Sequence, residues 1–130
     1  MLETKLETKI SRRRRDVFGI ILFDCYLWEG KEYFARIVIS QNSNRFEATR
    51  SDEDPTEAIW KAFCAALSCK YGLLEQAELF KTEIHKNDDG TNTAKVFFVG
   101  NGIVREGQGR HSNSYWAIAE ALVSGVNNLP

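Results

Sequence analysis

The sequence contains two copies of one pattern. Residues 34–67 read FARIVISQNSNRFEATRSDEDPTEAIWKAFCAAL, and residues 93–126, which lie 59 positions further on, read TAKVFFVGNGIVREGQGRHSNSYWAIAEALVSGV. Six aligned pairs are identical without a gap, whereas ordinary composition would produce roughly two. These pairs are Ala35/Ala94, Asn42/Asn101, Glu47/Glu106, Ala58/Ala117, Ile59/Ile118 and Ala62/Ala121. The pattern indicates an internal duplication.

The first half predicts three strands. An apolar run extends from Ile20 to Trp28 and is broken by Gly30. Residues 34–40 alternate between two faces, as a half-buried strand does. Asn42-Ser43-Asn44 has the composition of a turn, so we expect residues 45–49 to return beside the second strand as a hairpin.

A helix is predicted next. Asp54 can cap its N-terminus, Pro55 suits the first helical position, and Glu57 completes a capping box. Gly72 is a typical helix stop. One apolar face follows the helical spacing and comprises Ile59, Ala62, Phe63, Ala66 and Leu67.

The second half predicts the same order of elements. Strands are expected at residues 80–84, 94–99 and 103–106, with turns at 87–90 and 100–102. Asn113 is expected to cap a second helix, and we expect the glycines of Gly107-Gln108-Gly109 to ease the turn from strand to helix. Each half is therefore β-β-β-α. Since a three-stranded sheet with one helix cannot cover both of its faces, we expect an α+β fold in which two antiparallel sheets with one helix each are related by a pseudo-twofold.

The composition fits one small domain. The chain has 130 residues, of which 43% are hydrophobic, and a net charge of −1. We expect residues 1–16 to form a flexible charged tail and residues 17–130 to form one domain, with repeats at about 17–72 and 73–130. A (β/α)₈ barrel needs on the order of 250 residues, so this class is excluded.

No apolar run reaches the roughly 20 residues that span a membrane, and no secretory signal is recognisable. Cys25, Cys64 and Cys69 are odd in number and have the spacing of neither a disulfide framework nor a zinc site. We therefore expect reduced cysteines in a cytoplasmic protein.

Residues for catalysis are scarce in the sequence. His85 and His111 stand apart from each other and from the cysteines, so we expect no metal site, no cofactor and no enzymatic activity. Asp52, Glu53, Asp54 and Glu57 form the densest acidic cluster, but they surround a predicted helix start, where the helix dipole favours negative charge.

The duplicated pattern resembles the C-terminal regulatory and dimerisation domain of 2-isopropylmalate synthase and citramalate synthase. The resemblance covers about residues 18–129. The motifs that carry it are Gly90-Thr91-Asn92-Thr93-Ala94, Gly107-Gln108-Gly109, Asn113 followed by Ala117 and Ala121, Val126-Asn127-Asn128-Leu129, and Pro55-Thr56-Glu57-Ala58 followed by Ala62-Phe63.

This resemblance implies a homodimer linked to leucine biosynthesis, whose helix N-termini and adjoining strands bind leucine or isoleucine as a feedback inhibitor. It implies an effector site formed by Asp52, Asp54, Pro55, Thr56, Glu57, Phe80, Thr82, Ser112 and Asn113. The catalytic barrel of those synthases has no counterpart in this chain, so we expect a non-catalytic module that acts on a separate synthase chain.

Two alternatives remain. The glycines that the family places before its proline are replaced by Asp52-Glu53-Asp54, which would repel a carboxylate, and this favours an interaction module that has lost its effector. Binding of nucleic acid through Arg12–Arg15 is less favoured, because the net charge is slightly negative and the sequence lacks an aromatic–glycine RNA-binding motif.

Overall fold

The structure is a computed structural model that describes residues 17–71, 77–100 and 102–127. The predicted tail (residues 1–16) and the predicted helix stop at Gly72 lie outside the described residues.

Each half of the chain folds as three strands followed by one helix. The first unit comprises β1 (Gly19–Trp28), β2 (Glu32–Gln41), β3 (Asn44–Asp52) and α2 (Pro55–Tyr71). The second unit comprises β4 (Glu78–Lys86), β5 (Asn92–Gly100), β6 (Ile103–His111) and α3 (Ser114–Asn127). The strands form two antiparallel sheets, in the orders β1-β2-β3 and β4-β5-β6. The predicted α+β class with two β-β-β-α units is confirmed.

The two sheets have the same strand register. Tyr33 on β2 faces Asp52 on β3, and Asn92 on β5 faces His111 on β6, which are the positions 59 residues later. Since register determines which side of the sheet each side chain faces, this agreement means that equivalent positions of the two units point to the same side.

A β-bulge is duplicated as well. The register of β1 shifts by one residue between Ile20 and Leu22, and that of β4 shifts between Leu79 and Lys81, 59 positions on. The duplication therefore extends beyond the stretch in which the sequence revealed it, to the first strand of each unit.

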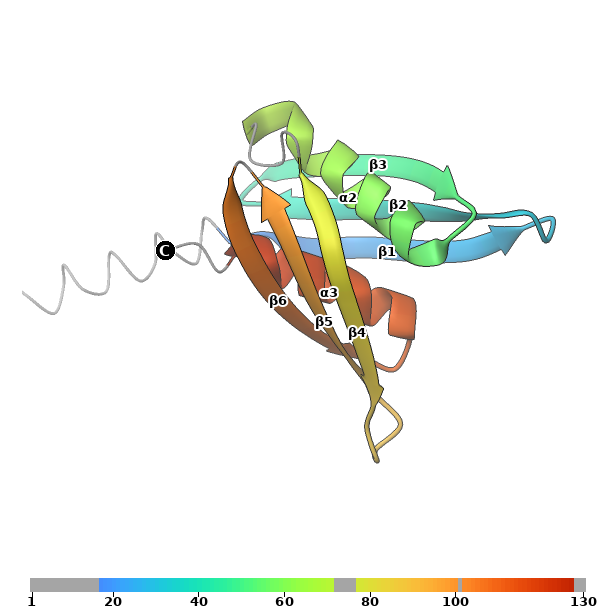
Figure 1. The fold of residues 1–130 in the computed structure, drawn as a ribbon. Coiled ribbons are helices and arrows are strands. Elements are labelled where there is room, and N and C mark those ends of the chain that lie inside the picture. The colour runs from blue at the N-terminus through green and yellow to red at the C-terminus, as the bar shows by residue number, and fades with distance from the viewer. Residues whose placement is uncertain (1–16, 72–76, 101, 128–130) are drawn as a thin grey trace, which may run out of the picture.

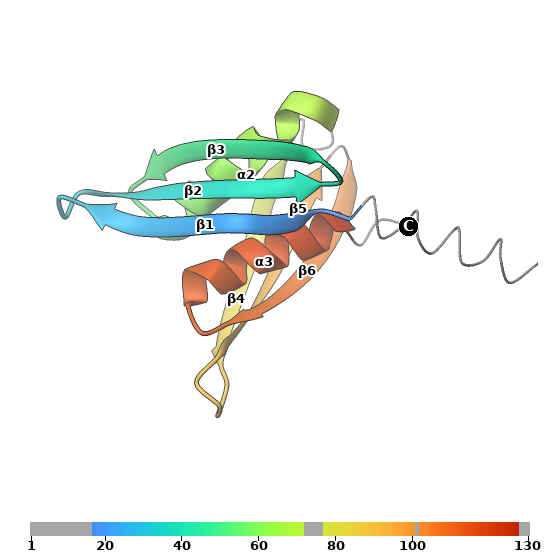
Figure 2. The same ribbon diagram turned by 180° about the vertical axis from the view of Figure 1, so that it is seen from behind.

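The helices lie between the two sheets. α2 packs on β2 and β3, whereas α3 packs on β5 and β6 and also contacts β1. Figures 1 and 2 show the strands of the two sheets crossing at a large angle, with both helices on the inner sides. One face of each sheet is thus covered and the other faces outward.

A single core joins the units. Both helices and both sheets contribute to one cluster of buried apolar residues. Phe98 of β5 lies 5.4 Å from the ring of Trp60 and 6.2 Å from that of Phe63, both on α2 of the other unit. The largest fully buried side chains are Phe63, Phe98, Ile37, Ile39, Ile59, Leu67, Ile118, Leu122, Val96 and Val126. Each contributes about 1.5–3 kcal/mol through burial.

The expected role of Gly107 and Gly109 was wrong. Both lie within β6, which continues to His111, rather than in a turn. A Cβ on Gly107 would stand 1.8 Å from the carbonyl oxygen of Ala121, and one on Gly109 would stand 2.4 Å from that of Ala117. These glycines let the backbone of α3 approach the strand closely.

The strands are longer than predicted. β3 reaches Asp52 instead of Thr49, and β6 reaches His111 instead of Glu106. Glycine has a low strand propensity, so the end of β6 gave no local signal. Contact with α3 explains why the strand nevertheless continues.

Candidate functional site at the helix N-termini

The start of α2 is held by two aspartates. Asp54 Oδ2 accepts the N–H of Glu57 at 3.0 Å, which confirms Asp54 as the N-cap. The predicted capping box was wrong, because the N–H of Asp54 is donated to Asp52 Oδ1, at 2.9 Å, and not to Glu57. Asp52 is the acceptor of this N–H because it lies only two residues away, at the end of β3.

Asp52 is also paired with a lysine. Its Oδ2 lies 2.5 Å from Lys61 Nζ, one and a half turns along α2. The hydrogen bond from the Asp54 N–H, followed by that from Lys61, lowers the pKa of Asp52, and the same contact raises the pKa of Lys61. Asp52 is therefore an ionised carboxylate that is already engaged by two donors.

The start of α3 repeats this arrangement with different atoms. Asn113 Oδ1 accepts the N–H of Trp116 at 3.0 Å, which confirms Asn113 as the second N-cap. His111 stands at the position equivalent to Asp52, and its Nδ1 accepts the N–H of Asn113 at 2.9 Å. Its ring stacks on Trp116, with centroids 4.9 Å apart. The second helix start thus has an amide and an imidazole as acceptors where the first has carboxylates.

The two helix starts lie at the same end of the molecule, as Figures 1 and 2 show. The rings of Tyr33, which faces Asp52 in the sheet, and Tyr115, the second residue of α3, are 6.1 Å apart. Burial raises the pKa of Tyr115, and so do its hydrogen bond with Tyr33 and the nearby Asp54. We call Tyr33, Asp52, Asp54 and Tyr115 the helix-start site.

The structure brings together only part of the predicted effector site. Asp52, Asp54, Pro55, Thr56 and Glu57 surround the start of α2, and Ser112 and Asn113 precede α3. Phe80 is 53% exposed at the bulge of β4, where its ring contacts Phe97. Thr82 lies opposite Val96. The contacts of Phe80 and Thr82 that the structure describes lie within the second sheet and not at the helix-start site.

Sequence reasoning missed the two tyrosines. Tyr115 stands 59 positions after Thr56, a residue already assigned to the site, so the duplication could have revealed it. Tyr33 follows from the hairpin register, since it is the cross-strand partner of Asp52. The contact between these tyrosines joins different units and has no local signal in the sequence.

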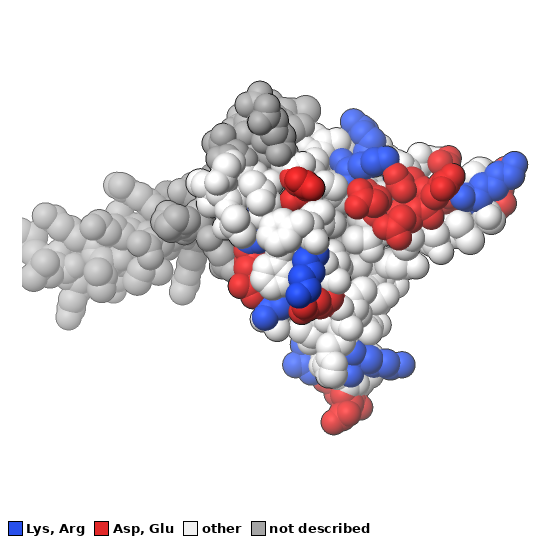
Figure 3. All heavy atoms as spheres, in the orientation of Figure 1, with Lys and Arg blue, Asp and Glu red and all other residues white. Residues whose placement is uncertain are grey.

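The helix-start site is acidic. Asp52, Glu53, Asp54 and Glu57 gather where α2 begins, and Figure 3 shows the acidic side chains together over this part of the molecule. The caps occupy the N–H groups of Asp54 and Glu57, which would otherwise attract an anion. The arrangement therefore suits an ammonium group better than a carboxylate.

The two cysteines whose side chains are described are unreactive. Burial, followed by the charge of Asp24, raises the pKa of Cys25 to about 11. Burial, followed by the charge of Glu57, raises the pKa of Cys64 to about 12. Both thiols are protonated at neutral pH and are poor nucleophiles. In the same described part of the chain, no three His, Cys, Asp or Glu residues are grouped to hold a metal ion.

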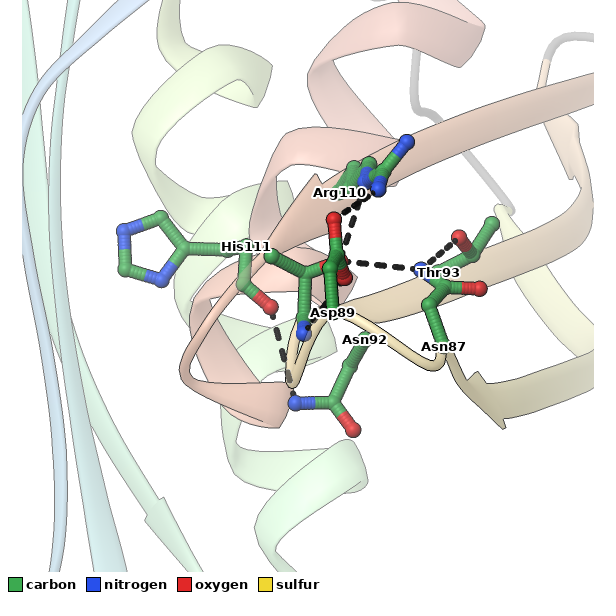
Figure 4. Close-up of polar contacts among 7 residues, drawn as sticks. Asn87, Asp89, Asn92, Thr93, Arg110 and His111 are labelled. Carbon is green, nitrogen blue, oxygen red and sulfur yellow. Dashed lines mark hydrogen bonds and ion pairs between the residues drawn. The ribbon is translucent and has the colours of Figure 1, made fainter.

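A polar network closes the hairpin between β4 and β5 (Figure 4). Asp89 accepts the backbone N–H of Thr91 at 3.0 Å and pairs with Arg110, whose Nε donates to Thr91 Oγ1 at 2.9 Å. Asn87 Nδ2 donates to Thr91 and Thr93 at 3.0 and 2.9 Å. Hydrogen bonds from Thr91, followed by Arg110, lower the pKa of Asp89 to about 2.

This network borders an open hollow of about 370 Å³ lined by His85, Asn87, Asp88, Asp89 and Arg110. Asp89 and Arg110 form an ion pair with each other, and both form hydrogen bonds with Thr91. The network therefore fixes the hairpin and ties it to β6, and its groups are not poised for chemistry.

The outward face of the first sheet carries an aromatic patch. Tyr26, Trp28 and Phe34 have ring centroids 6.0–6.4 Å apart, and Tyr26 and Trp28 are 44% and 53% exposed. The register pairs Tyr26 with Phe34 and Cys25 with the fully buried Ala35, so the aromatic rings point away from the core. We call Tyr26, Trp28 and Phe34 the outer aromatic patch.

In the described residues, no helix is long and apolar enough to cross a membrane. A scan against protein-family models finds no matching family, and a search of curated proteins finds no match.

Proposed function

We propose that this chain is a non-catalytic regulatory and dimerisation module of the kind found in 2-isopropylmalate synthase. In this proposal it works in the cytoplasm in branched-chain amino-acid biosynthesis, as a homodimer that acts on a separate synthase chain. The observation that carries the proposal is the ring contact between Tyr33 of the first unit and Tyr115 of the second, which supports a site at the junction of the two units. A ligand bound there would change how the units pack.

The chemistry of the site supports an amino-acid effector such as leucine or isoleucine. Asp54 would attract the ammonium group, since Asp52 is already paired with Lys61, and the tyrosine hydroxyl groups can donate and accept hydrogen bonds. The carboxylate would need a different partner, since the acidic side chains around the start of α2 repel it.

Thermal unfolding with leucine, isoleucine and valine tests effector binding. A ligand at 100 times its dissociation constant stabilises the protein by about 2.7 kcal/mol. Replacement Tyr115→Phe removes one hydroxyl group from the site and should weaken this effect. The matched control is Tyr26→Phe, which removes an exposed hydroxyl group on the outward face of the first sheet. A ligand shift that is equal in both variants would contradict binding at the helix-start site.

Dimerisation is supported by the outer aromatic patch, because exposed aromatic clusters commonly mark protein interfaces. Light scattering should give the mass of a dimer for the unmodified chain. Trp28→Glu should give a monomer, whereas Val104→Glu, at an exposed apolar position of the second sheet, should remain a dimer. A monomeric unmodified chain at high concentration would refute the dimer.

A specific observation favours a second candidate, a dimerising interaction module without an effector. Both helix starts already satisfy N–H groups with their own side chains, at distances of 2.9–3.0 Å. An unchanged unfolding temperature with millimolar amounts of all three amino acids, together with a dimeric mass, would support this candidate over the first.

A further inference from the structure

Arg105 is a buried charge for which the described part of the chain provides no acidic partner. It lies on β6 with 5% of its surface exposed, and its Nη1 atom is buried and has no hydrogen-bond partner. Burial lowers its pKa, but an arginine side chain remains protonated in proteins. In the described part of the chain, no ion pair joins Arg105 to an acidic side chain. A buried guanidinium with an unsatisfied donor is strongly unfavourable unless something neutralises it.

In the first unit, the position equivalent to Arg105 holds an aromatic residue. The residue 59 positions before Arg105 is Phe46, whose ring lies 6.2 Å from that of Phe18. In the second unit, Ala77 stands at the position of Phe18. Where the first unit has a pair of aromatic rings, the second has a small residue and an arginine, and therefore a charge in place of apolar volume.

The residue beside Arg105 in the sheet is apolar. It is Phe98, which belongs to the aromatic core with Trp60 and Phe63. On the same face of β6, Gly107 approaches Ala121 and Gly125 of α3, so Arg105 is placed towards the end of this helix. The helix end carries a partial negative charge that favours the guanidinium but does not neutralise it.

We propose that Arg105 is the receptor for a small oxyanion, a carboxylate or a phosphate, that binds at its buried guanidinium group. The planar guanidinium presents paired N–H donors that match both groups in a two-point contact. The burial of Arg105 strengthens this contact, because charges attract more strongly in a medium of low dielectric constant. This proposal does not depend on the proposed function, since the helix-start site lies on other residues.

Thermal unfolding at constant ionic strength tests the proposal, with chloride replaced in separate series by acetate or by inorganic phosphate. One of the two anions should raise the unfolding temperature in a saturable way, by roughly 10 °C at 100 times its dissociation constant. Arg105→Phe, which restores the residue of the first unit, should abolish this rise. Arg45→Gln, at an exposed position of β3, should retain it. The anion that acts identifies the ligand as a carboxylate or a phosphate.

An equal rise in Arg105→Phe and in the unmodified chain would overturn the proposal, because it would reflect a general effect of the salt. NMR provides a second readout that needs no phenylalanine variant. The Nε–H resonance of Arg105, assigned by its absence in Arg105→Lys, should move during titration with the active anion. A resonance that is unmoved by both acetate and phosphate would also overturn the proposal.

Discussion

The two units share their framework and differ in how each helix meets its sheet. Register, bulge and helix cap recur at the offset of 59, and so does an ion pair across the outward face, Arg36–Glu47 in the first unit and Lys95–Glu106 in the second. At the contact between the third strand and the helix, however, the first unit has Ala48, whereas the second has Gly107.

The difference shows which features of a duplicated unit tolerate substitution of most of its residues. Strand register and capping survive almost complete replacement of the sequence, because they depend on apolar alternation and on small acceptors at the right position. The closeness of the helix to the sheet depends on single residues. In the second unit the helix and strand backbones therefore approach closely at this contact, and this unit also contains Arg105, whose buried Nη1 atom has no hydrogen-bond partner.

The largest effect is expected where the units meet. Phe98→Ala removes the ring that packs on Trp60 and Phe63 of the first unit and should destabilise the protein by about 4 kcal/mol. Urea unfolding followed by fluorescence and by circular dichroism measures this loss. Both probes should report one transition, because the units share a core. Separate transitions in the unmodified chain would show that the units fold independently and would break the comparison.

A smaller effect is expected at the contact of α3 with β6. Gly107→Ala places a methyl group 1.8 Å from the backbone oxygen of Ala121, which cannot move without shifting the helix, so we expect a loss of about 3 kcal/mol. The reciprocal control is Ala48→Gly in the first unit, which removes a methyl group and should cost about 1 kcal/mol. Equal losses in urea unfolding would mean that the two helices contact their sheets alike.

The order of elements in each unit could be predicted because it depends on local signals. Alternation identified β2, and the caps at Asp54 and Asn113 identified the helix starts, as the hydrogen bonds confirm. The end of β6 could not be predicted. Glycine in a strand is explained only by the helix that lies against it, and that contact is tertiary.

The candidate site was predictable only in part, for the same reason. The residues next to each cap follow from the sequence, but the contact between Tyr33 and Tyr115 joins the two units. Arg105 gave no signal at all, because an arginine in a polar strand pattern is ordinarily exposed. Its burial is evident only from the structure.

The helix caps should contribute equally in the two units. Asp54→Ala and Asn113→Ala each remove the acceptor for one N–H at the helix start, so each should destabilise the protein by about 1 kcal/mol. Urea unfolding of the two variants checks this expectation. A loss confined to one variant would show that the duplicated geometry no longer carries equal stability.

The smallest effect is expected at the first hairpin loop of each unit, between β1 and β2 and between β4 and β5. The stability of these two loops should respond differently to acid. Asp89 has a pKa of about 2 in the folded protein against an ordinary value of 3.8, so its contacts stabilise the fold above about pH 4 and are lost as the pH falls towards 2. The equivalent residue of the first unit is Gly30, which has no charge to lose. Melting temperatures of the unmodified chain and of Asp89→Asn should therefore differ at pH 5 and converge near pH 2. A difference that stays constant over this range would show that the Asp89 carboxylate does not stabilise the hairpin through its charge, and the two loops would then be equivalent in acid.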